Sequence, residues 1–367
     1  MTRRPAATVD GVDAAAYVIP TDEPESDGTI AWDSTTIVVV HVRAGRSTGM
    51  GYTYGDRSIV EFVRSELAGV VEGSDPFDVG RTWNEMGAAI RNAGRPGVGM
   101  MAIAAIDVAL WDLEARLLDV ALVDLLPAYR DEVAVYGSGG FTSYTLERIE
   151  AQLGGWVDDG IPRVKMKVGR RPADDPARLD TARKAIGDAA LFVDANGAFD
   201  RKQALAWAHR YRGEWDVVWF EEPVTSADFE GLRLVRDRGP GGLDVAAGEY
   251  AYVLTDFTNL VTNGCVDCLQ VDATRAGGIT GVQQAAGLAA GHHVEVSGHC
   301  APNLSAHALC GLPGVRHLEY FHDHVRIERL LFDGVLEPVG GALRPDRDRP
   351  GHGLVLKQAD AEPYRVA

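Results

Sequence analysis

The stretch RVKMKVGRRPADDPARLDTARKAIGDAALFVDANG, residues 163–197, contains one complete strand–helix–strand unit of the predicted fold. RVKMKVG (163–169) and LFVDANG (191–197) are short apolar runs typical of buried strands, and ARLDTARKAIGD between them favours a helix. Each strand ends in an ionisable residue, Lys167 in the first and Asp194 in the second, 27 positions apart. That separation fits one strand plus one return helix, which predicts a parallel β-α-β unit.

The same unit recurs along the chain. Further apolar runs are VVWFEEP (217–223), DVAAGE (244–249), CLQVDAT (268–274), HVEVSGH (293–299) and VRHLEYF (315–321). They end in Glu221, Glu249, Asp272, His299 and Glu319, at spacings of 27, 28, 23, 27 and 20 positions counted from Asp194. With VAVYGSGGF (133–141) as the first, eight strands are predicted, and no G-x-G-x-x-G turn follows that strand. In a closed parallel barrel such strand ends meet at one mouth, which predicts a single active site there.

Residues 1–128 do not follow this rhythm. Antiparallel strands are predicted at VDAAAYVIP (12–20) and TTIVVVHVRA (35–44), a polar loop at TDEPESDGTIAWDS (21–34), a turn at GYTYGD (51–56), and helices from about 57 to 126. We therefore expect a small α+β unit at 1–128, which contains a lid loop, and a catalytic barrel at 129–322. The segment 323–367 is rich in Gly, Pro, Asp and Arg, and is expected to follow the surface without forming a third domain.

Composition narrows the class of protein. The net charge of −17 over 367 residues argues against nucleic acid as a partner. The most apolar segment, 98–126, contains charged residues such as Asp107 and Asp112, so it is predicted to be a buried helix and not a membrane span. No apolar signal segment follows the basic N-terminus, and a cytoplasmic location is expected. The C-x-x-C of Cys265 and Cys268 lacks a second pair, which favours ordinary buried thiols.

Carboxylates end three consecutive strands, at Asp194, Glu221 and Glu249. A single such residue is usually a helix cap or a solvated rim charge. Three in succession would repel one another at a barrel mouth, so a cation is expected among them. Carboxylate oxygens suit a hard ion such as Mg²⁺. Because side chains alternate along a strand, only one of Glu221 and Glu222 is expected to point inward.

Two lysines share one face of a strand. The chain has five lysines and 31 arginines, yet Lys165 and Lys167 flank Met166. Burial, a like charge nearby and a metal ion all disfavour protonation. Lys167 is therefore predicted to be a base whose pKa Lys165 lowers, a role that arginine cannot fill. The alternative is that both lysines simply neutralise the carboxylates, and the two roles are compatible.

Asp272 and His299 are expected to form a dyad in which the carboxylate fixes the tautomer of the imidazole. The dyad would lie across the metal site from Lys167 as a second acid/base group. Glu319 could hydrogen-bond a substrate carboxylate, although a rim ion pair is nearly as well supported by its position. We also expect Asn196, Ser138 and Trp32 to contact the substrate.

Seven motifs together carry a family resemblance: K-x-K (165–167), D-A-N (194–196), E-E-P (221–223), G-E (248–249), Asp272 before A-T-R-A-G-G-I-T, S-G-H (297–299) and H-L-E (317–319). The chain resembles the mandelate racemase subgroup of the enolase superfamily. The resemblance implies a modified TIM barrel, (β/α)7β, with an α+β cap to which the C-terminal segment returns. It also implies one Mg²⁺ per subunit on Asp194, Glu221 and Glu249, the bases Lys167 and His299, and a homo-oligomer, from dimer to octamer. Asp119 departs from the pattern, where a glycine is expected.

In this chemistry a base removes the proton alpha to a carboxylate, and metal charge stabilises the enolate. If the substrate carries a 3-hydroxyl, His299 can protonate it as it leaves, and the product is a 2-keto-3-deoxy acid. Without that hydroxyl, reprotonation on the other face gives racemisation or epimerisation of an α-hydroxy acid, which is the alternative. The acidic lid, roughly Pro20 to Trp32, suits a polyhydroxylated acid better than a phenyl ring. We therefore expect an acid-sugar dehydratase acting on an aldonate or aldarate. A non-catalytic barrel is the third possibility, and it predicts loss of at least one of these residues.

Overall fold

Residues 6–367 are described by the computed structural model, and their central feature is a closed barrel of eight parallel strands. The first barrel strand pairs in parallel with both the second and the last, which closes the sheet. The strands are β4 (Val133–Gly139), β5 (Arg163–Lys167), β6 (Ala190–Asp194), β7 (Val217–Glu221), β8 (Asp244–Ala247), β9 (Cys268–Val271), β10 (Glu295–Gly298) and β11 (Val315–Phe321). The predicted fold class is confirmed.

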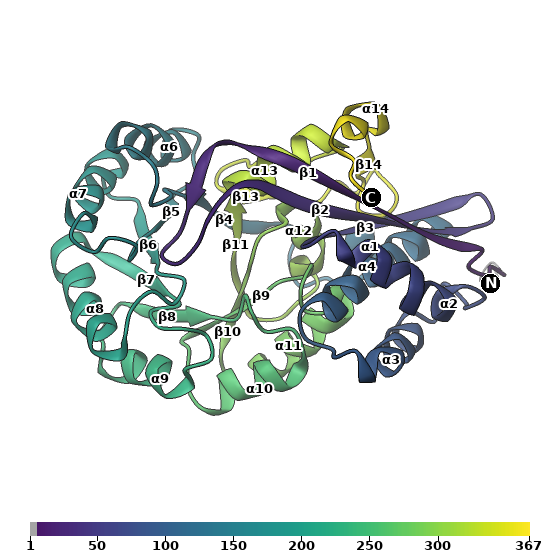
Figure 1. Cartoon of the computed structure of the whole chain (residues 1–367), viewed down its shortest axis with the longest axis horizontal. Coiled ribbons are helices and arrows are strands. Elements are labelled where there is room, and N and C mark those ends of the chain that lie inside the picture. The colour runs from purple at the N-terminus through teal and green to yellow at the C-terminus, as the bar shows by residue number, and fades with distance from the viewer. Residues whose placement is uncertain (1–5) are drawn as a thin grey trace.

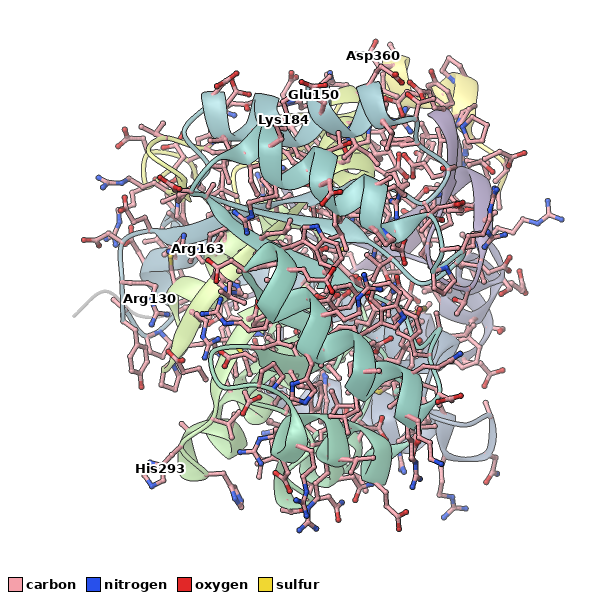
Figure 2. The ribbon with its side chains drawn as sticks, turned by 90° about the vertical axis from the view of Figure 1, so that its left-hand side faces the viewer. Arg130, Glu150, Arg163, Lys184, His293 and Asp360 are labelled. Carbon is pink, nitrogen blue, oxygen red and sulfur yellow. The ribbon has the colours of Figure 1, made fainter. Side chains whose placement is uncertain are left out.

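Within residues 133–321, seven helices connect the eight strands and surround the barrel (Figure 1), which is the predicted (β/α)7β order. They are α6 (Leu146–Asp158), α7 (Asp175–Ile186), α8 (Arg201–Trp215), α9 (Phe229–Arg238), α10 (Leu254–Thr262), α11 (Gly278–Gly291) and α12 (Pro302–Cys310). Charged residues are frequent on α6 to α9, and Figure 2 shows Glu150 on α6 and Lys184 on α7 at the surface.

An aromatic layer fills the barrel beneath the ionisable strand ends. Phe192 and Trp219 stack with ring centroids 5.4 Å apart, and Tyr136 lies 5.3 Å from Phe192. Phe192 and Trp219 precede Asp194 and Glu221 by two positions, so they point inward from the same face of their strands, one layer deeper. This packed layer gives the site a rigid, dry floor.

The cap consists of a three-stranded antiparallel sheet and helices that pack on it. The elements are β1 (Gly11–Ser26), β2 (Ala31–Ala44), β3 (Ser47–Tyr54), α1 (Ser58–Phe62), η1 (Val63–Leu67), α2 (Ala68–Val71), α3 (Val79–Ala89), η2 (Ile90–Asn92), α4 (Val98–Leu118) and α5 (Leu122–Leu125). The apolar segment predicted to be a buried helix forms α4, and among the described residues no helix is long and apolar enough to cross a membrane.

Two predictions for the cap were wrong. GYTY, expected in a turn, forms the end of β3, which pairs with β2 from Ile37↔Tyr54 to Ala44↔Ser47. The polar stretch 21–34, expected to be a loop, mostly continues β1 and β2 as a ribbon, with a register shift between Pro20 and Glu25. Much of this ribbon is exposed, so its sequence is polar although its backbone is extended. Figure 1 shows this ribbon reaching across the barrel.

Asp119, where the resemblance suggested glycine, ends α4 in the left-handed conformation, with φ of 55° and ψ of 44°. Aspartate is one of the few residues other than glycine that adopt this conformation readily, so the helix ends in the usual way.

The C-terminal segment contains α13 (His322–Leu331), β12 (Phe332–Asp333), β13 (Ala342–Leu343), β14 (Val355–Leu356), α14 (Gln358–Ala361) and η3 (Glu362–Tyr364). It contacts the cap, because the backbones of Ala16 and Val366 hydrogen-bond at 2.9 Å and His352 donates to the Met50 carbonyl at 2.7 Å. It also contacts the barrel, because β13 pairs antiparallel with β4. The division of the chain at residues 128 and 322 stays a prediction.

Candidate active site

The ionisable strand ends do converge at one mouth of the barrel, and all are buried. Register pairs place Lys167 beside Asp194 and Asp194 beside Glu221. The Nζ of Lys165 lies 2.5 Å from Glu221 Oε1, 2.8 Å from Glu319 Oε1 and 3.3 Å from Asp194 Oδ2. The structure thus brings together all eight residues predicted for catalysis and metal binding: Lys165, Lys167, Asp194, Glu221, Glu249, Asp272, His299 and Glu319.

Each of the three consecutive carboxylates is held on one side by a neutral or backbone donor. Asp194 Oδ1 accepts from the Asn196 amide at 2.9 Å, Glu221 Oε2 from the Trp219 indole at 3.0 Å, and Glu249 Oε1 from the Asn196 side chain at 3.4 Å. Their other oxygens face cationic side chains, at 2.5 Å from Lys167 for Asp194 and at 2.6 Å from His299 for Glu249. All the donors of this set are carboxylate oxygens, the ligand chemistry that a hard divalent cation prefers.

Local backbone conformation directs two of these carboxyl groups. Gly248, before Glu249, has φ of 140°, and a Cβ there would lie 2.2 Å from the Gln270 carbonyl oxygen. Only glycine allows β8 to turn Glu249 inward at this distance. Glu222 follows the end of β7 with φ of 38°, so strand alternation no longer applies. Burial and the nearby Glu249 raise the pKa of Glu222, whose side chain is buried. The expectation that only one of Glu221 and Glu222 points inward stays a prediction.

The pKa of Lys167 is set by burial, by Lys165 and by three nearby carboxylates. Burial and Lys165 do lower the pKa of Lys167, but Asp194, Glu249 and Glu221 outweigh them, so it lies above the ordinary value for lysine. Burial likewise opposes the charge on Lys165, whose pKa Glu221 and Glu319 raise. Burial raises the pKa of Glu221 to about 8. The lysines and carboxylates therefore pair as opposite charges, and the role of Lys167 as a base stays a prediction.

The predicted dyad is present. His299 Nδ1 lies 2.7 Å from Asp272 Oδ2, and Asp272 Oδ1 accepts from the backbone and the hydroxyl of Thr274, both at 2.7 Å. Both oxygens of Asp272 are thus committed, and the carboxylate sets the orientation of the ring. Burial lowers the pKa of His299, but the combined effect of Cys300, Glu249 and Glu319 raises it by more. The net shift of the His299 pKa is therefore upward.

Above these residues lies a cavity of about 310 Å³. The predicted substrate contacts Asn196 and Trp32 line it, but Ser138 does not. Ser138 is fully buried and donates to Glu319 Oε1 at 2.6 Å. It therefore positions Glu319 and does not itself line the cavity. The other wall residues include Asp27, Ile30, Ser34, Thr35, Thr36, Tyr54, Tyr250, Arg275, Cys300, Phe321 and His324.

Several wall residues were missed by sequence reasoning. Tyr54 stacks on His324 with ring centroids 3.4 Å apart, and burial lowers the pKa of His324 to about 3, so this imidazole is neutral. Tyr54 and Thr35 belong to the cap, and no local pattern links them to the barrel. Arg275 and Cys300 had a signal, because each lies within three positions of a dyad residue. The four cysteines are free and buried, as expected.

The β1–β2 ribbon is docked on the barrel mouth. At its tip a Cβ on Gly28 would lie 2.2 Å from the Ala195 carbonyl oxygen, so glycine is needed for this approach. Thr142 hydrogen-bonds the Ser26 hydroxyl at 2.6 Å, and the Trp32 ring meets Phe141 edge-on at 5.5 Å. The ribbon therefore forms the roof of the cavity, as the lid prediction requires.

Docking of this ribbon is expected to weaken as pH rises. Burial and the nearby Asp323 raise the pKa of Glu25 from 4.5 to about 8, although the Trp32 indole donates to it at 2.8 Å. The docked ribbon thus binds a proton more tightly than the free one. The contribution of Glu25 to docking is fully present below pH 4.5, is lost progressively up to about pH 8 and does not change further above it.

Hydrogen exchange of residues 20–32, corrected for the intrinsic effect of pH, measures this change. Glu25→Gln keeps an acceptor for Trp32 and cannot ionise, so its ribbon should show protection that is independent of pH. Equal pH dependence in the wild type and the variant would contradict the prediction.

Comparisons with known proteins identify the family to which this chain belongs. Residues 148–361 match the family described as enolase C-terminal domain-like, and residues 16–127 match the mandelate racemase / muconate lactonizing enzyme N-terminal domain. Together these regions cover most of the chain. The chain therefore belongs to the enolase superfamily, in the mandelate racemase subgroup.

Individual relatives span nearly the whole chain. The 3,6-anhydro-alpha-L-galactonate cycloisomerase of Streptomyces coelicolor is 31% identical, over 92% of this chain and 93% of its own length. The L-talarate/galactarate dehydratase of Salmonella typhimurium is 30% identical over 97% and 92%. Its structure liganded with Mg and L-lyxarohydroxamate gives a TM-score of 0.91, covering 100% of this chain and 95% of that one, at 27% identity. A mandelate racemase/muconate lactonizing enzyme-like protein from Rubrobacter xylanophilus is 58% identical, with a TM-score of 0.96 and coverage of 98% and 100%.

Proposed function

We propose that this protein is a Mg²⁺-dependent dehydratase of an acid sugar, an aldonate or aldarate, which it converts into a 2-keto-3-deoxy acid. One observation carries the proposal: Lys167 on β5 and the His299–Asp272 pair lie on either side of the carboxylate-bearing strands β6–β8, beneath a cavity with hydroxyl-bearing walls. The hydroxyls of Ser34, Thr35, Thr36 and Tyr54 suit a polyhydroxylated chain better than an aromatic ring. Relatives named as dehydratase and cycloisomerase of such acids support it.

Asp194, Glu221 and Glu249 would hold the Mg²⁺. When bound there, the ion would stabilise negative charge on the substrate carboxylate and compete with Lys167 for Asp194, which lowers the pKa of Lys167. The aromatic layer beneath and the docked ribbon above exclude water, which strengthens every charge interaction in the site.

The residues then share the proton transfers. Lys167 or His299, according to the configuration at C2, accepts the α-proton as the C2–H bond breaks. His299 as imidazolium donates a proton to the C3 hydroxyl, the C3–O bond breaks and water leaves. The enol that remains tautomerises to the 2-keto-3-deoxy acid. Glu319, fixed by Ser138 and Lys165 at Oε1, faces the cavity, and when protonated at Oε2 it would donate a hydrogen bond to the substrate carboxylate while charge develops there.

The second candidate is racemisation or epimerisation of an α-hydroxy acid, because the same two groups could remove and return a proton on opposite faces of C2. Proton NMR with Mg²⁺ in D₂O, against a panel of aldonates and aldarates, distinguishes the two. Loss of the α-proton signal with new 2-keto-3-deoxy signals is the expected result. Deuterium exchange without elimination would favour the racemase, and no change across the panel would count against an acid-sugar substrate.

A further inference from the structure

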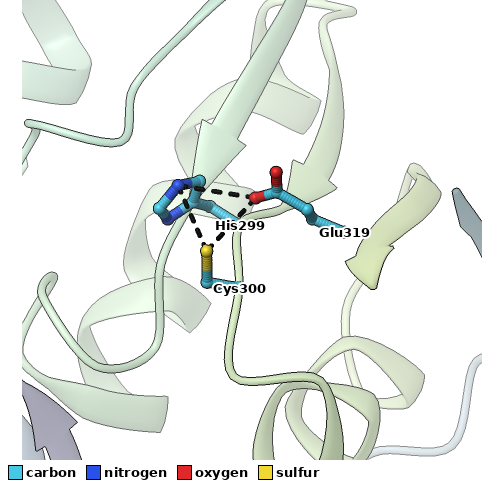
Figure 3. Close-up of side chains that lie close together, drawn as sticks. All are labelled: His299, Cys300 and Glu319. Atoms are coloured by element: carbon cyan, nitrogen blue, oxygen red, sulfur yellow. Dashed lines mark hydrogen bonds and ion pairs between the residues drawn. The ribbon is translucent and has the colours of Figure 1, made fainter. Parts of the chain in front are cut away.

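Three different metal-ligand atoms meet at one corner of the cavity. His299 Nε2, Cys300 Sγ and Glu319 Oε2 are separated by 3.4 Å, 3.3 Å and 3.4 Å around a nearly equilateral triangle (Figure 3). All three residues are buried, and all three line the cavity. The reaction proposed above gives the Cys300 thiol no role.

This triangle has the dimensions of one face of a tetrahedral zinc site. Zinc bonds of about 2.0 Å to nitrogen and oxygen and about 2.3 Å to sulfur place neighbouring ligands about 3.3–3.6 Å apart. The observed separations of 3.3–3.4 Å agree without movement of the backbone. A fourth position, for water or a ligand, would open toward the cavity of about 310 Å³.

The surrounding contacts already orient the ligand atoms. Asp272 holds His299 by Nδ1, which is the arrangement that presents Nε2 to a metal. Ser138 and Lys165 bind Glu319 through Oε1, which leaves Oε2 facing the triangle. The cost is the contact between His299 Nε2 and Glu249 Oε2 at 2.6 Å, which metal binding must break.

We propose that His299, Cys300 and Glu319 form a second metal site, selective for Zn²⁺ or a similar thiophilic divalent ion and distinct from the oxygen-ligand site at Asp194, Glu221 and Glu249. The imidazole and thiolate select Zn²⁺ and its analogues Co²⁺ and Cd²⁺, whereas Mg²⁺ prefers an all-oxygen set. On binding, the Cys300 S–H bond breaks, the thiolate bonds the metal and the proton passes to solvent. Bound zinc occupies Nε2 of His299, so it inhibits the enzyme; this consequence rests on the proposed function, but the binding does not.

Titration of the full-length enzyme with Co²⁺, in saturating Mg²⁺, tests the site. A sulfur-to-cobalt charge-transfer band should appear and saturate at one equivalent, because the carboxylate site offers no sulfur. Cys300→Ser should lose the band and bind Co²⁺ at least about 100-fold more weakly. Cys268→Ser and Cys310→Ser, which alter buried thiols elsewhere, should keep it. Cys300→Ala gives a second test of the same ligand, and circular dichroism checks that each variant folds.

Absence of the band in the wild type, or its survival in Cys300→Ser, would overturn the proposal. Inhibition is measured separately, as the fraction of each variant's own Mg²⁺-supported activity that remains with Zn²⁺. Loss of inhibition in Cys300→Ser, but not in Cys310→Ser, supports the site. A saturating charge-transfer band without inhibition by Zn²⁺ would uphold the metal site and contradict the role given to His299.

Discussion

For a substrate whose C2–H faces Lys167, Lys167→Arg is expected to reduce dehydration by about 10²–10⁴-fold, and Lys167→Met by at least as much, because each removes the general base. The Nζ of Lys167 lies 2.5 Å from Asp194 and at the wall of the cavity, where it can reach a substrate held above the carboxylates. Arginine keeps the positive charge that neutralises Asp194 but does not deprotonate in proteins. The arginine variant therefore separates catalysis from neutralisation, the two roles that the sequence left open for this lysine.

Initial rates on the substrate identified by NMR measure this effect, and calorimetry with Mg²⁺ shows whether the metal site survives. Lys184→Met is the matched control, because Lys184 is exposed on α7 (Figure 2) and does not line the cavity. Activity of Lys167→Arg within about tenfold of the wild type on such a substrate, with Mg²⁺ binding intact, would show that Lys167 only neutralises charge.

The barrel residues of the site could be predicted from the sequence because two local rules coincide there. Strand alternation decides which residues point inward, and the spacing of the strand–helix units decides which strand ends meet. Asp194, Glu221 and His299 satisfy both rules and lie within the cluster. The rule of strand alternation does not apply to Glu222, because this residue follows the end of β7 and has a φ of 38°.

The cavity walls could not be predicted in this way. Tyr54 and Thr35 reach the site only because the cap sheet packs over the barrel, and no spacing along the chain encodes that approach. The prediction of a loop at 21–34 failed for a related reason. Much of this ribbon is exposed and therefore polar, and polarity alone indicates a loop. The pKa of Lys167 required the number of carboxylates within contact, which depends on three-dimensional distances.

Asp272→Asn is the second change with a large expected effect, a loss of dehydration of about 10²–10⁴-fold. The reason lies in the partners of the two carboxylate oxygens. Oδ1 must still accept from the Thr274 backbone and hydroxyl, so the new amide nitrogen takes the position of Oδ2, 2.7 Å from His299 Nδ1. An amide donor there requires Nδ1 to accept, which moves the ring proton to Nε2. The imidazole then cannot accept a proton at the atom that faces the cavity.

To show that loss of the dyad is the cause, α-proton exchange and elimination are measured separately in each variant. A substrate whose C2–H faces Lys167 should still exchange deuterium in Asp272→Asn and in His299→Asn, while elimination fails because no imidazolium protonates the leaving hydroxyl. In Lys167→Arg the same substrate should lose both reactions, since the first proton is never removed. A merely destabilised site would lower exchange and elimination together in all three variants. Elimination within about tenfold of the wild type in Asp272→Asn, against an Asp188→Asn control, would remove the dyad from the mechanism.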